Sequence, residues 1–167
     1  MNRKRPIPLL IAVPAALIAL CVLLFVGLFE PAADEAWAER FLQKNESRLP
    51  ALIEESSGQY ISRDHLFFSL NRLQSIDGRA ENGVICFSFT SPNIEGFTAL
   101  YYCPDGTVPE AARWWSPEAR DWQTLPALSD VPPEGLRIDG LGANARGHIY
   151  FSLLAPDWLF IDANLPT

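Results

Sequence analysis

The chain has 167 residues, of which 49% are hydrophobic and 20% charged, and this balance excludes an intrinsically disordered protein. The net charge of −7 is unevenly spread, because residues 1–29 carry only three basic side chains, whereas residues 30–167 carry 10 basic side chains against 20 acidic ones. An acidic domain repels the phosphate backbone, so we expect no nucleic-acid partner. The length is typical of one domain with an appendage.

The first thirty residues predict an attachment to a membrane. Residues 7–29 form a run of 23 without a charged side chain. As a helix this run spans ~35 Å, which is enough to cross a hydrocarbon core of ~30 Å. Arg3, Lys4 and Arg5 precede the run, and acidic residues follow it. We therefore expect residues 1–6 to form a cytoplasmic tail and the chain after residue 29 to lie outside the membrane.

Two alternatives to an uncleaved anchor stay open. One is a cleaved signal peptide, although the run exceeds the usual apolar length of ~7–15 residues and Pro31 makes Glu30–Ala33 a poor cleavage site. The other is a lipoprotein signal modified at Cys21, although the large Leu20 stands where a small residue is expected. The uncleaved membrane helix agrees best with the sequence.

A helical pattern follows the membrane segment. Between Asp34 and Ser57 the apolar residues recur at helical spacing, which predicts a juxtamembrane helix within residues 30–58. Pro50 interrupts the pattern, so we expect either a kink or two short helices. Gly58 is a natural end for this element.

Short strands are predicted after Gly58. Alternating apolar residues at 66–70 indicate a strand, although a helix fits the same residues. Val84–Thr90 and Phe97–Cys103 are rich in β-branched and aromatic side chains and predict a β-hairpin. His148–Leu154 and Trp158–Asp162 predict a second hairpin.

The stretch between the two hairpins gives a poorer signal. Five prolines and four glycines interrupt residues 107–147, and only Glu110–Trp115 indicates a helical turn. A helix followed by short strands, without regular crossover helices, predicts an α+β fold. We expect residues 59–167 to form an extracytoplasmic α+β domain, in which the juxtamembrane helix packs on a small antiparallel sheet.

Two cysteines, Cys86 and Cys103, lie in the strands of the first predicted hairpin. A disulfide between them would close a loop of ~17 residues and add about 3 kcal/mol in the chain-entropy model. The compartment outside the membrane would permit this bond. The alternative is a pair of small buried thiols at staggered positions, and the sequence does not set the register that decides between the two.

No motif predicts a metal site, a cofactor site or a catalytic residue. The two histidines, His65 and His148, do not stand at metal-ligand spacings. The chain lacks the G-x-S-x-G turn of serine hydrolases. Its glycines between 135 and 147 are not followed by the Lys-Ser or Lys-Thr of a phosphate loop. We therefore expect neither a metal nor a cofactor.

Tyrosines and tryptophans gather in the second half of the chain. These residue types dominate the hot spots of binding surfaces, but they also fill the cores of small sheet domains. Both interpretations stay open here. If they are exposed, the candidate partner surface consists of Tyr101, Tyr102, Trp114, Trp115 and Trp122.

Residues Tyr101–Gly106 (YYCPDG) resemble the YYSPDD-like motif of a group of short, uncharacterised, membrane-anchored proteins of Gram-positive bacteria. The resemblance covers residues 80–167, and the N-terminal anchor, the helix after it and the closing strand Trp158–Ala163 are similar too. Cys103 replaces the serine of the motif, Gly106 replaces its second aspartate, and the closing strand lacks the tyrosines of the group. The resemblance implies a shared architecture and no particular activity.

These features predict a single-pass membrane protein whose outer domain is a non-enzymatic binding or accessory module of the cell envelope. Its expected partners are the membrane, through residues 7–29, and an envelope protein. Two alternatives stay open. An envelope hydrolase would show a deep pocket with a titratable group of shifted pKa. An inert domain, whose partner binds the membrane helix, would bury its aromatic residues and have no pocket.

Overall fold

The structure, a computed structural model, describes residues 33–63, 72–89, 96–142 and 145–165. The expected membrane helix and the expected strand at 66–70 lie outside these ranges. Within them, no helix is long and apolar enough to cross a membrane.

Two α-helices precede nine strands in the part of the chain that is described. In chain order they are α2 (Glu35–Asn45), α3 (Leu49–Ser56), β1 (Tyr60–Ser62), β2 (Leu73–Asp77), β3 (Ile85–Phe89), β4 (Gly96–Tyr102), β5 (Arg113–Ser116), β6 (Asp121–Thr124), β7 (Leu136–Leu141), β8 (Gly147–Ala155) and β9 (Trp158–Asn164). Seven strands form one antiparallel sheet in the order β1-β2-β3-β4-β9-β8-β7, and β5 pairs only with β6. The expected α+β class with an antiparallel sheet is confirmed.

The helical segment divides into two short helices, which was one of the two expected outcomes. Helix α2 begins after Asp34, whose carboxylate accepts a hydrogen bond of 2.8 Å from the backbone N–H of Trp37. Pro50 lies in the first turn of α3, where a helix does not need the missing N–H. Gly58 follows α3 with a φ of 75°, a conformation that glycine adopts without strain.

Both predicted strand pairs are present in the sheet. Phe87 on β3 lies opposite Leu100 on β4, and Phe151 on β8 lies opposite Ile161 on β9. The predicted helical turn at Glu110–Trp115 is wrong, because Arg113–Ser116 pairs with β6 as a strand. The sequence interpretation also missed β1, β2, β6 and β7.

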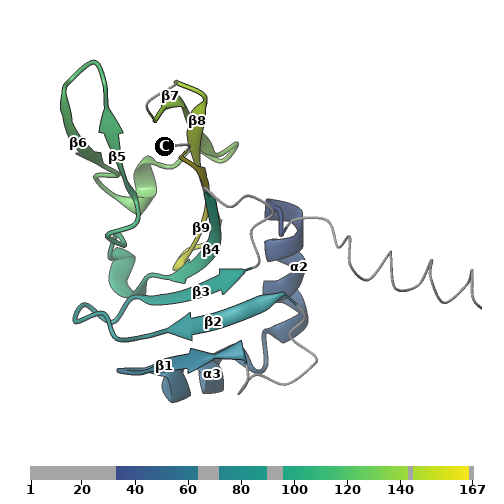
Figure 1. Ribbon diagram of the computed structural model, residues 1–167. Helices are drawn as coiled ribbons and strands as arrows, with labels where there is room; N and C mark the ends of the chain where they lie inside the picture. The colour runs from purple at the N-terminus through teal and green to yellow at the C-terminus, as the bar shows by residue number, and fades with distance from the viewer. Residues whose placement is uncertain (1–32, 64–71, 90–95, 143–144, 166–167) are drawn as a thin grey trace, which may run out of the picture. The chain divides into compact units, whose positions relative to one another are not determined.

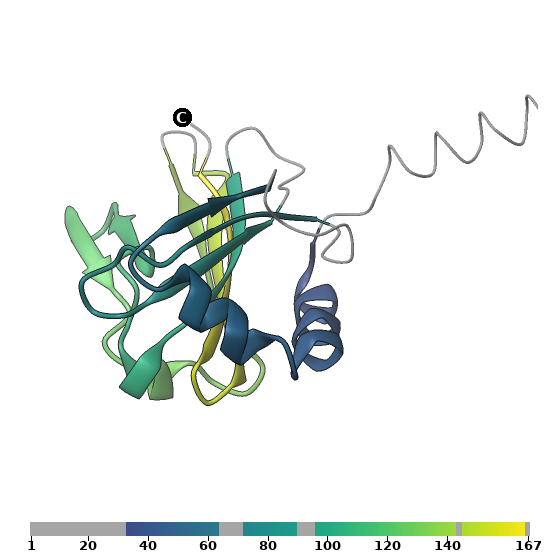
Figure 2. The ribbon, with the colours of Figure 1, turned by 90° about the horizontal axis from the view of Figure 1, so that it is seen from below.

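The two helices cover one face of the sheet, as Figures 1 and 2 show. Alternate residues of the strands face them, as a half-buried sheet requires. The buried side chains of this layer include Phe41, Leu52, Phe87, Leu100 and Phe160. Burying each such side chain contributes about 1.5–3 kcal/mol, so this layer is a principal source of the stability of the fold.

A polar contact fixes the start of α2 on the sheet. The carboxylate of Glu35 accepts a hydrogen bond of 2.8 Å from the hydroxyl of Tyr150 and a second one from the hydroxyl of Ser152, both on β8. Gly135 makes room for the tyrosine, because a Cβ atom at this position would overlap the Tyr150 ring. The N-terminal end of the domain is thereby held against the sheet.

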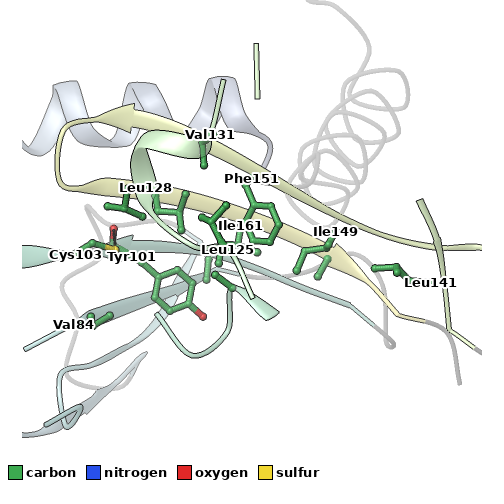
Figure 3. Packing of buried hydrophobic residues seen from close by; sticks show 14 residues of the cluster. Val84, Tyr101, Cys103, Leu125, Leu128, Val131, Leu141, Ile149, Phe151 and Ile161 are labelled. Atoms are coloured by element: carbon green, nitrogen blue, oxygen red, sulfur yellow. Dashed lines mark hydrogen bonds between the residues drawn. The ribbon is translucent and has the colours of Figure 1, made fainter. Parts of the chain in front are cut away.

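The opposite face of the sheet is only partly covered. The segment between β4 and β7 places Leu125, Leu128 and Val131 over an apolar layer that includes Ile149, Phe151 and Ile161 (Figure 3). The residues that line a groove on this face belong to β1–β4 and to two neighbouring loops. One half of the face therefore belongs to the core, and the other half is open.

Candidate functional site

The β5–β6 hairpin carries two of the three exposed large aromatic side chains of the described structure, and the third is Tyr60 on β1. Trp115 lies opposite Trp122 in its register, and their side chains are 46% and 56% exposed. Figure 1 shows the hairpin as a two-stranded arm beside the main sheet. Because successive strand residues point to opposite faces, Arg113, Trp115, Trp122 and Thr124 share one face of the hairpin. We call these four residues the tryptophan face.

The rings of this face are held by their neighbours. The centroids of Trp115 and Trp122 are 5.9 Å apart in an edge-to-face arrangement, which is a favourable geometry for aromatic pairs. The guanidinium of Arg113 lies 5.1 Å from the centroid of Trp122. The pair is therefore pre-arranged, so little side-chain freedom remains to be lost when a partner binds.

The other three aromatic residues of the predicted partner surface lie elsewhere. Tyr101 is buried under the apolar layer and is not part of an exposed surface. Tyr102 points to the helix-covered face, where its ring lies 5.3 Å from that of Trp158. Trp114 points to the inner side of the hairpin and packs against Phe151, with 5.9 Å between the ring centroids. The structure thus brings only Trp115 and Trp122 together.

The two cysteines are free thiols in the structure. Cys86 lies opposite Tyr101, and Cys103 is two residues further along, so the cysteines are diagonal neighbours. Diagonal Cα atoms are about 7–8 Å apart, beyond the usual span of a disulfide. Burial raises the pKa of the Cys86 thiol and raises the pKa of Cys103 to about 12, so both thiols are protonated at neutral pH. Neither has the thiolate character of a nucleophile.

His148 makes a contact with a carboxylate on the helix-covered side. Its Nε2 atom lies 3.6 Å from Asp162 Oδ2, and the hydroxyl of Thr98 donates a hydrogen bond of 3.0 Å to Asp162 Oδ1. Because the hydroxyl is bound to the carboxylate and not to the imidazole, these groups lack the nucleophile–base contact of a hydrolase. His65 lies outside the described residues. Within the described ranges, no three His, Cys, Asp or Glu side chains are grouped to hold a metal.

A groove of about 950 Å³ lies on the open half of the sheet face opposite the helices. Asp77 on its floor accepts two hydrogen bonds from the guanidinium of Arg79, of 2.8 and 2.6 Å. The hydrogen bonds from Arg79 lower the pKa of Asp77, so this carboxylate stays ionised. No signal in the sequence marked this groove.

Comparisons with protein-family models, with curated proteins and with solved structures gave no match to this chain.

Proposed function

We propose that this chain is a membrane-anchored binding module, whose outer domain contacts another protein of the cell envelope through the tryptophan face. The uncharged run at residues 7–29 supports the anchor, and the basic residues before it support a cytoplasmic N-terminus. The resemblance of Tyr101–Gly106 to a motif of membrane-anchored proteins of Gram-positive bacteria agrees with the same architecture.

The observation that carries the proposal is the exposure of the Trp115–Trp122 pair. Placing a tryptophan ring in water forgoes the gain from its burial, and a folded domain has a core in which such rings can be placed. Arg113 beside them completes a set of residue types that is enriched in binding hot spots. A neighbouring protein that covers both rings would recover the apolar burial that the isolated domain lacks.

The titratable groups in the described structure favour binding over hydrolysis. The thiols of Cys86 and Cys103 have raised pKa values, and the carboxylate of Asp77 has a lowered one. A general acid at neutral pH would need a carboxyl group with a raised pKa, and a thiol nucleophile would need a lowered one. The pKa values of these three groups are shifted in the directions opposite to those that hydrolysis would need.

Site-specific photo-cross-linking in intact cells tests this function. A photoreactive phenylalanine analogue in place of Thr124, on the tryptophan face, is expected to capture one reproducible envelope protein. The same analogue in place of Glu39, which is exposed on α2, serves as the matched control and should not capture it. Equal capture from both positions, or no adduct from position 124, would show that the tryptophan face is not a contact surface.

A further inference from the structure

The groove on the open half of the sheet has a floor of small and polar side chains. The strand register places four residues side by side across β1 to β4, namely Tyr60, Asp77, Cys86 and Tyr101. In the next row of the same face, Ser75 lies opposite Ser88, and Ser88 lies opposite Ala99. Because serine and alanine are small, they leave a space that larger side chains would fill. The groove is therefore a consequence of the sequence.

The floor offers hydroxyl groups that have few partners within the protein. Ser75 is nine-tenths buried and lines the groove, and its hydroxyl makes no hydrogen bond with any residue that the structure describes. The hydroxyl of Ser88 makes a weak contact of 3.4 Å with Cys86 Sγ, in which either atom can be the donor. The hydroxyl of Tyr101 interacts with the thiol of Cys86, which lies opposite it in the strand register. A hydroxyl that faces the groove and has no partner in the protein can donate and accept hydrogen bonds, so it favours a ligand that does the same.

The charges around the groove favour a cation. Three acidic residues line it, Asp77, Glu81 and Glu110, against one basic residue, Arg79. Asp77 is already neutralised by Arg79, whose guanidinium also lies 5.4 Å from the centroid of the Tyr60 ring. Glu81 and Glu110 are exposed, and neither forms an ion pair within the described residues.

We propose that this groove binds a peptide segment that carries a basic side chain. The peptide backbone, which both donates and accepts hydrogen bonds, satisfies Ser75 and its neighbours. The basic side chain lies near Glu81 and Glu110 and repeats the contact that Arg79 already makes with a carboxylate and a tyrosine ring. An acidic ligand would be repelled, and an uncharged sugar would lack the charge attraction that a basic side chain gains from the two carboxylates. This site is separate from the tryptophan face and does not depend on the proposed function.

Calorimetric titration of the full chain in a non-ionic detergent with acetyl-Lys-Lys-Lys-amide tests the proposal. We expect binding to the parent protein, weakened about tenfold in the double variant E81Q/E110Q. The variant E39Q/E46Q removes two exposed carboxylates from the helical region and serves as the charge-matched control, with unchanged affinity. Ser75→Ala, which removes only the hydroxyl, should weaken binding several-fold.

Three outcomes would overturn the proposal. They are an absence of tri-lysine binding up to ~1 mM, an equal loss of affinity in E81Q/E110Q and E39Q/E46Q, and tighter binding of an uncharged N-acetylglucosamine trimer. The variant W115S/W122S should keep its affinity for tri-lysine even if it loses its envelope partner. The experiment therefore distinguishes a groove that does not bind tri-lysine from a tryptophan face that does not bind an envelope protein.

Discussion

Replacing Phe160 with alanine is expected to lower the free energy of unfolding by about 3–5 kcal/mol. Phe160 is 1% exposed and lies on β9, between Leu100 of β4 and Ser152 of β8. Its ring belongs to the layer that joins the sheet to α2 and α3. Truncation to alanine leaves a cavity, and the two neighbouring strands and the helices cannot move enough to fill it. A domain of this size is stable by about 5–15 kcal/mol, so the loss is a large share of the total.

The same truncation at Phe97 provides the matched control. Phe97 is the corresponding residue type on the neighbouring strand β4, but it is only partly buried. We expect urea denaturation of the purified chain to show a clearly smaller loss for Phe97→Ala than for Phe160→Ala. Equal losses at the two positions would contradict the burial described for the helix-covered layer.

The double substitution W115S/W122S is expected to weaken binding of the envelope partner at least about 100-fold. Each hot-spot tryptophan contributes about 2 kcal/mol or more, and both rings lie on one face. The cost to the domain should be limited to the ring–ring contact, about 0.5–1.5 kcal/mol, because neither side chain is part of the core. Affinity for the protein captured from position 124, together with thermal unfolding, measures the two effects.

Tyr60→Ser is the control for this prediction. Tyr60 is also an exposed aromatic residue, at 51%, but it lies on β1 beside the groove. Its substitution should leave the envelope partner bound. If Tyr60→Ser weakens binding as strongly as W115S/W122S does, exposure of aromatic side chains alone would explain the effect and the tryptophan face would have no special role.

The sequence predicted those strands whose local pattern is strong. Residues 84–90 and 97–103 are rich in β-branched and aromatic side chains, and the same holds for the pair that became β8 and β9. Strand β7 was missed because Asp139, Gly140 and Gly142 are typical of a loop, whereas in the structure Gly140 sits at an irregularity of the β7–β8 register. At this edge of the sheet the local composition favours a loop, but pairing with β8 holds the segment as a strand.

The candidate sites were harder to predict, because register and burial create them. The sequence could not show that Tyr101 is buried while Trp115 is exposed, since tyrosine and tryptophan serve in either place. It also could not show that Tyr60, Asp77 and Tyr101 form one row, because this depends on the pairing of four strands. The tryptophan pair was named in advance as part of a larger surface, whereas the groove had no sequence signal.

The central claim is that residues 7–29 hold the acidic domain at the outer side of a membrane. A cysteine introduced at Thr167 and a membrane-impermeant maleimide test this claim in intact cells. Labelling is counted relative to the parent chain, because Cys103 is buried but Cys86 is partly exposed. The variant Asn2→Cys is the matched control for the cytoplasmic end. We predict that T167C is labelled in intact cells and that N2C is labelled only after the membrane is opened. Labelling of N2C with protection of T167C, or recovery of the full-length chain in the soluble fraction, would contradict the account.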